Sequence, residues 1–352
     1  MYLDLLKIFI PTTLAFFWAI FLTPFFTNFF FTYKMWKKKG RTLNTTSEEF
    51  KAIHARIEKE EVSVPCIGGS LIWVSVLSVI LLFYFLALIL PNSIFYDLNF
   101  LSRSQTLIPI AVFFLGALLG LVDDLLEING KTNITRSAKW YTQSKIFAII
   151  LVALATALWF YFKLDMNSIY VPFYGDYYLG LWIIPLFIVV ALATFSGGVI
   201  DGIDGLSGGV LASIFASFTM ISFATNQLDL AALSLTITGS ILAFLWFNIP
   251  PARFYMGETG MMPLTLIIAV FAFLTNSVLV LPIIAMPLVI TSLSNIIQML
   301  SKKFRNGRRV FKVAPLHHHF ESIGWPSYKV TMRYWIFSIV FAILGVILFV
   351  IS

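Results

Sequence analysis

Apolar runs long enough to cross a lipid bilayer recur along the whole chain, and they limit its fold more than any other feature. A spanning helix needs about 17–25 mainly apolar residues. When the runs are bounded by charged residues and Gly/Pro breaks, they predict about ten such helices, near residues 5–31, 66–90, 106–122, 146–163, 180–196, 208–225, 230–247, 261–275, 279–300 and 334–351. The sequence therefore predicts an all-α membrane protein.

The composition supports this class and excludes a separate soluble domain. Of the 352 residues, 59% are hydrophobic and only 12% are charged, whereas about a quarter of the residues in soluble domains are charged. The connections between the runs are mostly short, so we expect residues 1–352 to form one integral membrane domain. The first run lacks a small-residue cleavage site, and we expect it to be retained as a span.

The net charge of +7 is compatible with nucleic-acid binding or with basic membrane loops. In a chain this apolar, the excess of positive charge is better explained by basic loops that orient the chain in the membrane and by contacts with membrane lipids and anionic ligands. We therefore expect no nucleic-acid partner. The single cysteine, Cys66, excludes an intrachain disulfide and is expected to be a small buried residue. No spaced Cys/His set of the zinc type occurs in the sequence.

Basic residues indicate the orientation of the chain in the membrane. The connections after the first, third and ninth predicted spans hold Lys34, Lys37, Lys38, Lys39, Arg41, Lys131, Arg136, Lys139, Lys145, Lys302, Lys303, Arg305, Arg308, Arg309 and Lys312. Those after the even spans hold almost no Lys or Arg, apart from Arg103. The positive-inside rule therefore places the ends of the odd spans in the cytoplasm and both termini outside.

Two connections have patterns of their own. On the outer side, residues 169–179 alternate β-branched and aromatic residues around Gly175-Asp176, which predicts a small extracytoplasmic β-hairpin with a Gly-first turn. On the inner side, residues 42–64 are polar with mixed charge. They fit either a surface helix or a mobile loop, and the sequence does not decide between these.

Four polar clusters each follow an odd-numbered predicted span: Asp123 with Asp124, Asp201 with Asp204, Glu258, and His317 with His318 and His319. An ionisable residue at the centre of a spanning helix costs about 2.5–3.5 kcal/mol, so we expect the carboxylates at the interface or around a wet cleft. A chain that crosses the bilayer back and forth brings all four clusters to one face. This convergence predicts a single active site.

The two aspartate pairs have different settings. Asp123 and Asp124 are predicted to end the third span, and adjacent carboxylates on a helix point about 100° apart. Alone, that pair fits a solvated helix end equally well. Asp201 and Asp204 lie in a Gly-rich segment and share a face if the segment is helical. Glycines permit close approach of a bulky anionic ligand, and a merely flexible loop does not explain two acids between apolar spans.

Residues 247–260 place an amide, an aromatic ring and a carboxylate in one predicted turn. Asn248 and Tyr255 suit hydrogen bonding to a nucleotide base and stacking on it, and Glu258 suits a metal ligand or a general base. The histidines of residues 317–319 suit hydrogen bonding, proton transfer or phosphate binding near neutral pH.

Hard oxygen donors without thiols favour Mg²⁺ or Mn²⁺, and Mg²⁺ is usually held by one or two carboxylates together with substrate phosphates. Carboxylates and basic groups on one face therefore suit metal-assisted phosphoryl transfer, in which the protein mainly positions both partners. A site at the membrane surface implies that one of these partners is a lipid.

The motifs resemble those of the polyprenyl-phosphate N-acetylhexosamine-1-phosphate transferase superfamily, most closely its phospho-N-acetylmuramoyl-pentapeptide transferase family. The most specific stretch runs from Lys312 through the triple histidine to residues 325–326, followed by Lys329 and Arg333. The other matches are residues 120–124, 201–206 and 247–260, and Lys139 with Gln143. The resemblance covers nearly the whole chain.

This resemblance implies a ten-span inner-membrane enzyme of peptidoglycan and cell-wall synthesis that acts as a homodimer. Such an enzyme moves phospho-MurNAc-pentapeptide from UDP-MurNAc-pentapeptide to undecaprenyl phosphate, giving lipid I and UMP, with Mg²⁺. We expect displacement by the lipid phosphate in one step, with a covalent phospho-aspartate at Asp124 as the alternative.

The resemblance also implies roles for individual residues. Asp123 and Asp124 match a catalytic pair that activates the lipid phosphate and helps to hold the metal, and Glu258 falls on a metal-binding aspartate. His317 matches a catalytic histidine near the phosphates. The implied substrate-binding residues are Lys139, Asp201, Asp204, Asn248, Tyr255, His318 and His319.

The sequence departs from the family pattern at several of these places. Glu258 is one methylene longer than the usual aspartate, and Phe195 and Gly198 stand where the family carries two asparagines. Glu127 replaces a lysine after the aspartate pair. In the first loop, only residues 64–69 keep part of the pattern, and His54, Arg56 and Lys59 could substitute for its missing basic residues.

The sequence is compatible with three alternatives. A sibling enzyme that transfers GlcNAc-1-phosphate would share most of the motifs, although the triple histidine favours the muramoyl family. The departures around Glu258 also fit a weakly active or inactive relative that binds lipid-linked sugars. A transporter is disfavoured, because transporters place ionisable groups near the bilayer midplane rather than at the ends of spans.

Overall fold

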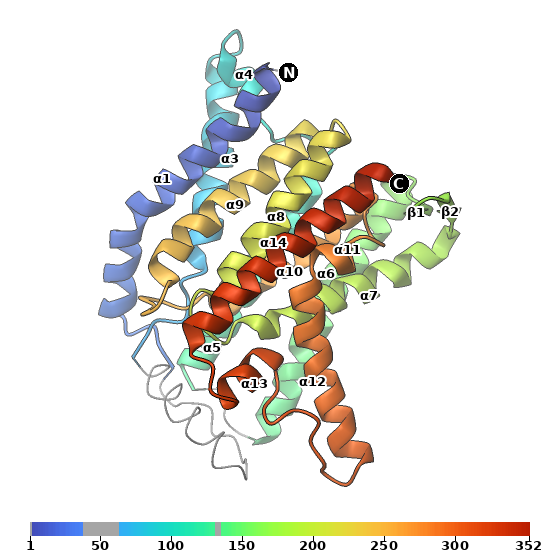
Figure 1. Cartoon of the computed structure of the whole chain (residues 1–352). Helices are drawn as coiled ribbons and strands as arrows, with labels where there is room; N and C mark the ends of the chain where they lie inside the picture. The colour runs from blue at the N-terminus through green and yellow to red at the C-terminus, as the bar shows by residue number, and fades with distance from the viewer. Residues whose placement is uncertain (1, 38–62, 131–134) are drawn as a thin grey trace.

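The computed structural model describes residues 2–37, 63–130 and 135–352, and for residues 135–140 only the backbone. Within these residues, nine helices are long and apolar enough to span a bilayer. They are α1 (Tyr2–Thr32), α3 (Ser70–Ile89), α5 (Leu107–Ile128), α6 (Thr135–Lys163), α7 (Ile183–Ser196) with the short 3-10 turns η1 (Gly180–Trp182) and η2 (Gly197–Ile200), α8 (Leu206–Ala224), α9 (Leu228–Asn248), α10 (Gly257–Leu274) and α14 (Ser327–Ile351) (Figure 1). The predicted all-α membrane class is confirmed. The 42–64 connection lies outside the described residues except for its last two.

The ninth predicted span is not one continuous helix. Residues 279–300 contain the end of a turn, the short helix α11 (Leu281–Ile284) and most of α12 (Met286–Phe304), which meet at Ala285. Pro282 and Pro287 each stand in the first turn of one helix. Proline is tolerated there, but it cannot continue a preceding helix because it lacks the N–H and clashes with the turn before it. The prolines therefore divide this predicted span in two.

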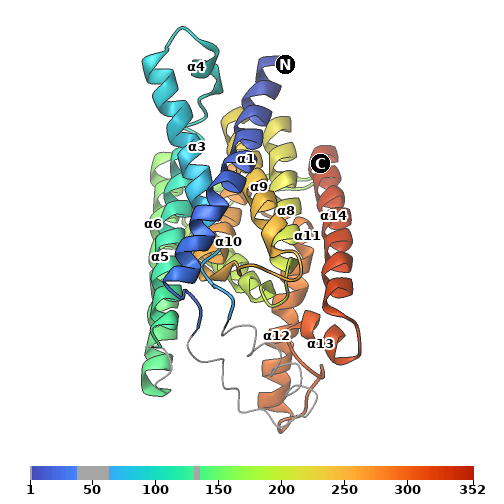
Figure 2. The same ribbon diagram turned by 90° about the vertical axis from the view of Figure 1, so that its left-hand side faces the viewer.

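The bundle has a buried centre and an apolar surface. Helices α8, α9 and α10 bury most of their residues, whereas α1, α6 and α14 bury only a minority of theirs. The exposed side chains are largely apolar, such as Phe17 and Phe25 of α1, as a helix facing lipid requires. Helix α9 packs between α1 and α8, and α14 covers α8 (Figure 2). This arrangement leaves α10 at the centre, in contact with α5 and α7.

Helices α5 and α10 touch through their backbones. A Cβ atom added at Gly120 of α5 would lie 2.1 Å from the carbonyl oxygen of Glu258 in α10. No side chain larger than hydrogen fits in this space, so glycine permits the contact. The contact fixes the C-terminal part of α5 beside the first turn of α10.

The predicted hairpin is present, but its turn lies elsewhere. Strands β1 (Ser168–Val171) and β2 (Gly175–Tyr178) pair antiparallel, with Val171 opposite Gly175. The turn is therefore formed by residues 172–174, and the predicted Gly-first turn at residues 175–176 is wrong. Pro172 has the fixed φ that suits the start of a turn, and Phe173 takes a positive φ of 68°. The hairpin lies near the C-terminal end of α14, away from α13 (Leu316–Ser322) (Figure 1).

Candidate active site

The four polar clusters meet at one end of the bundle. Asp124 of α5 accepts hydrogen bonds from the backbone of α10. Asp204 accepts one from the backbone N–H of Ala252, and the rings of His317 and His318 lie against Gly202. Segments far apart in the sequence thus form one site, as the alternation of the spans predicts.

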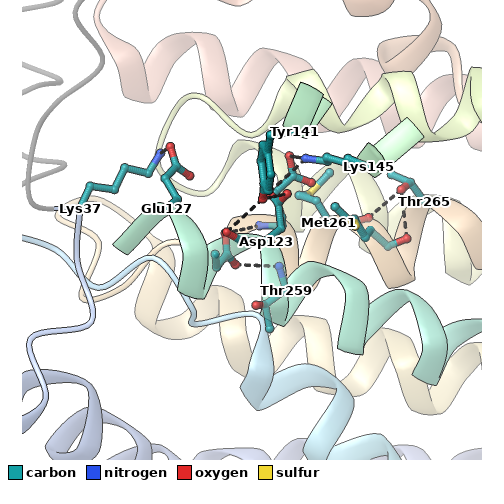
Figure 3. A network of polar contacts seen from close by, with 11 residues as sticks. Lys37, Asp123, Glu127, Tyr141, Lys145, Thr259, Met261 and Thr265 are labelled. Carbon is teal, nitrogen blue, oxygen red and sulfur yellow. Dashed lines mark hydrogen bonds and ion pairs between the residues drawn. The ribbon is translucent and has the colours of Figure 1, made fainter. Parts of the chain in front are cut away.

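Asp123 and Glu258 share one cation, the ammonium of Lys145. Lys145 Nζ lies 3.1 Å from Asp123 Oδ2 and 2.6 Å from Glu258 Oε1. The hydroxyl of Tyr141 donates to Asp123 Oδ1. Figure 3 shows Tyr141 and Lys145 approaching Asp123 from the same helix, α6. Carboxylates from α5 and α10 therefore point at a single positive group.

Three helices reach farther than predicted, and this extension builds the cluster. Helix α5 runs to Ile128 instead of ending near residue 122, because two leucines after the aspartates continue its apolar face. Asp123 and Asp124 therefore lie inside the helix and not at its end. Helix α10 begins at Gly257 rather than near residue 261, so that Glu258 stands in its first turn and not in a loop.

Helix α6 begins at Thr135 instead of near residue 146. Tyr141 and Lys145 therefore lie four residues apart on one helical face. Neither residue was predicted to belong to the site, and Lys145 was expected to be a basic loop residue. Their spacing at the start of an apolar run was the signal that could have identified them. Lys139 also lies in α6, but its side chain is outside the described residues, so its role stays a prediction.

Asp124 caps helix α10 from a neighbouring helix. Its side chain is buried, and it accepts the N–H of Glu258 at 3.2 Å and that of Thr259 at 2.8 Å, one on each oxygen. The first N–H groups of a helix have no partner within the helix and favour a carboxylate. Asp124 thus holds the first turn of α10 in place, and with it Glu258.

Asp201 and Asp204 do not share a helical face, because residues 201–205 form turns. Asp201 Oδ1 accepts a hydrogen bond of 2.7 Å from the Ser207 hydroxyl. Burial raises the pKa of Asp201 to about 6, and the charge of Glu258 adds to this, against the hydrogen bonds from Ser207 and from the Gly257 backbone. Asp204 instead accepts the N–H of Ala252 at 3.0 Å.

Asn248 and Tyr255 hold the connection between α9 and α10. The buried Asn248 amide accepts the Gly205 N–H at 3.0 Å and donates to the Phe254 carbonyl at 2.9 Å. The backbone N–H of Tyr255 donates to the carbonyl of Pro65 at 2.8 Å, and its own carbonyl accepts the Gly68 N–H. Tyr255 as a whole is half-buried.

The three histidines of α13 have three different environments. His317 is fully buried, and neither ring nitrogen has a hydrogen-bond partner within the described structure. Burial and the neighbouring His318 lower the pKa of His317 well below its usual range, so this ring is neutral. His318 Nδ1 lies 2.7 Å from Glu321 Oε2, and His319 Nδ1 accepts the N–H of Lys312 at 3.3 Å.

The donor chemistry of this site fits a hard divalent cation. In the part of the chain that the structure describes, no three acidic, histidine or cysteine side chains are close enough to hold a metal alone. Asp123 and Glu258 nevertheless converge on the ammonium of Lys145, which marks a position where positive charge is stable. Mg²⁺ is commonly bound by one or two protein carboxylates, and substrate phosphates and water supply its remaining oxygen ligands.

Comparison with known proteins gives consistent matches. Residues 106–276 match the family model described as glycosyl transferase family 4. The phospho-N-acetylmuramoyl-pentapeptide-transferase of Oceanobacillus iheyensis is 31% identical over 351 residues, covering 98% of each chain. The protein of the same name from Latilactobacillus sakei is 31% identical over 330 residues, 93% of this chain and 95% of the relative. That from Chloroflexus aurantiacus is 31% identical over 299 residues, 81% and 77% of the two chains.

Proposed function

This chain belongs to the phospho-N-acetylmuramoyl-pentapeptide-transferase family, and from that premise we propose that it transfers phospho-MurNAc-pentapeptide from UDP-MurNAc-pentapeptide to undecaprenyl phosphate. An oxygen of the lipid phosphate forms a bond to the phosphorus that carries the sugar. The bond from that phosphorus to the bridging oxygen breaks, so UMP leaves and lipid I is formed. The observation that carries this proposal is the convergence of Asp123 and Glu258 on one cation position, at the same end of the membrane bundle as the buried His317.

The environments of the carboxylates support different roles in this transfer. The Asp123 carboxylate, held by Tyr141 and Lys145, is the group we assign to orienting the lipid phosphate, through the cation that it would help to hold. Asp124 is buried, and both of its oxygens accept backbone N–H groups, which makes it a poor nucleophile. This favours displacement in one step over a covalent phospho-aspartate at Asp124.

Mg²⁺ is the cofactor we propose, with Asp123 and Glu258 as its protein ligands and Asp124 holding Glu258 in place. When bound, the ion would neutralise charge on the diphosphate as the phosphorus–oxygen bond breaks. His317 presents a neutral ring that can donate a hydrogen bond to a phosphate oxygen without adding charge.

The substrate cleft would be formed by the turn at residues 201–205, the connection between α9 and α10, and helix α13. Asp204 and Asn248 hold the segments that line this cleft in place by hydrogen bonds to their backbone. Asp201 and the Tyr255 ring are the groups that we assign to binding the sugar nucleotide. His318, His319 and Lys139 complete the proposed contacts to the substrates.

We further propose that the protein lies in the inner membrane as a homodimer with this site facing the cytoplasm. The orientation rests on the basic residues that follow the odd-numbered spans. Undecaprenyl phosphate would reach the site from the bilayer, and the sugar nucleotide would reach it from the cytoplasm.

Release of UMP tests the proposed function. The purified protein is incubated with undecaprenyl phosphate, UDP-MurNAc-pentapeptide and Mg²⁺, with the Oceanobacillus iheyensis relative as a positive control. We expect UMP and lipid I, and no product when UDP-GlcNAc is the only donor. Product from UDP-GlcNAc instead would assign the chain to the sibling reaction. No product from either donor, while the relative is active, would support a binding protein.

A further inference from the structure

The Lys145 ammonium has three contact partners within the site. Its ammonium contacts Asp123 Oδ2 and Glu258 Oε1 and lies 5.6 Å from the centre of the Phe195 ring. Only 17% of the Lys145 side chain is exposed. The aromatic face adds a third attraction to those of the two carboxylates, because a cation is drawn to the electron-rich face of a ring.

Two of these partners are positions where the sequence departs from the family pattern. Glu258 is longer than an aspartate, and its carboxylate comes within 2.6 Å of the ammonium. Phe195 stands where the family carries an asparagine. The asparagine amide could bind a metal, whereas the Phe195 ring has no metal ligand and can attract an ammonium only through its face. Together with Lys145, these residues form one contact cluster that is suited to a side-chain cation.

We propose that Lys145 is the resident counter-ion of Asp123 and Glu258, and that a divalent cation binds this protein only by displacing the Lys145 ammonium. The two positive charges cannot share the position, since like charges at contact distance repel strongly where little water screens them. The ligand-free protein therefore has a low affinity for divalent cations. This inference rests on the proposed function for the use of a cation, but its test needs no turnover.

Binding of Mn²⁺ to the metal-stripped full-length protein, without substrates, tests this proposal. Free Mn²⁺ is measured by its electron paramagnetic resonance signal. Lys145→Met removes the competing charge and keeps an apolar stem of similar length, so we expect it to bind Mn²⁺ at least about tenfold more tightly than the wild type, a change of about 1.4 kcal/mol. Lys145→Arg keeps the charge and should bind as weakly as the wild type.

Lys37→Met is the matched control. Lys37 lies 3.0 Å from Glu127, and so it is also a lysine paired with a carboxylate of α5, but it lies apart from the cluster around Asp123 (Figure 3). This variant should not change Mn²⁺ affinity. Adding Asp123→Asn to Lys145→Met should abolish the tight site, which shows that the ion binds there and not elsewhere.

Equal Mn²⁺ affinity of the wild type and Lys145→Met would overturn the proposal, as would equal tightening by Lys37→Met. If Lys145→Met does not give a monodisperse protein, Lys145→Gln removes the same charge while retaining a polar end. Failure of the UMP-release assay leaves this binding measurement intact, so the two hypotheses fail separately.

Discussion

Asp123 and Asp124 are adjacent in the sequence, yet their environments separate their roles. Asp123 faces two side-chain donors of α6, the Tyr141 hydroxyl and the Lys145 ammonium. Asp124 contacts the backbone of α10 instead and accepts hydrogen bonds from two of its N–H groups. At the residue scale, the first is available for chemistry and the second determines where Glu258 stands.

Asp124→Asn tests this division. The amide can accept only one of the two N–H groups with its oxygen, and it leaves the other facing an NH₂ group. A buried N–H group left without its acceptor costs about 1–3 kcal/mol, so we expect the melting temperature in detergent to fall by several degrees, together with UMP release. Glu127→Gln, one turn further on and in an ion pair with Lys37, should change the melting temperature little.

A variant Asp124→Asn that melts like the wild type but releases no UMP would contradict the positioning role. It would indicate that the Asp124 carboxylate itself takes part in the reaction.

Asp201 predicts a pH-dependent stability. Its pKa rises from 3.8 when unfolded to about 6 when folded, so the native state binds the proton more tightly, and this group destabilises the protein as the pH rises through that interval. Two pKa units correspond to at most about 3 kcal/mol, and the partial exposure of Asp201 reduces this to about 1 kcal/mol.

Asp201→Asn cannot ionise and should therefore melt a few degrees above the wild type at pH 7.5. The gap should close towards pH 4.5, where the wild-type carboxyl is protonated. Melting curves at both pH values measure this difference. A gap that is equal at both pH values would show that ionisation of Asp201 is not its cause.

At the scale of elements, the contact between α5 and α10 sets the geometry of the site. Gly120→Ala would place a methyl group 2.1 Å from the Glu258 carbonyl oxygen, so the two helices must move apart. We expect UMP release to fall at least about tenfold, the equivalent of about 1.4 kcal/mol in the barrier, while the circular dichroism spectrum remains helical.

Gly198→Ala is the packing control for this variant, because the nearest atoms to its added Cβ lie 4.0 Å away in Met261. It should fold and melt like the wild type. A Gly120→Ala variant with full activity would mean that the spacing of α5 and α10 does not control the position of Glu258.

The sequence predicted elements more reliably than it predicted their ends. Apolar runs located all nine spanning helices found among the described residues, because burial in lipid demands them. The starts of α6 and α10 were missed because both begin with polar residues, which are stable in a helix only through partners elsewhere in the fold. Lys145 in α6 has its carboxylate partner Glu258 113 residues away, and no local pattern reveals such a pair.

At the scale of the whole molecule, alternation of the spans was sufficient to predict that the four clusters meet. It could not predict how they meet. The distinct settings of Asp201 and Asp204 follow from turns at residues 201–205, and the burial of His317 follows from packing against Gly202. Both depend on contacts between distant segments.

The proposed orientation can be tested with the native cysteine background. Cys66 is buried, and burial together with the nearby charge of Asp124 raises the pKa of its thiol, so it should not react with a membrane-impermeant maleimide. Tyr174→Cys, at the exposed tip of the hairpin, should be labelled in intact cells. Asn306→Cys, after α12, should be labelled only after the membrane is opened. The reverse pattern would place the site outside.

Metal-dependent release of UMP tests the central claim most directly. UMP is measured from UDP-MurNAc-pentapeptide and undecaprenyl phosphate with the wild type and with Asp123→Asn, each with Mg²⁺ or with excess chelator. We predict UMP only from the wild type with Mg²⁺. Equal release by Asp123→Asn, or release that chelator does not diminish, would contradict a site in which Asp123 and Glu258 together hold the cation.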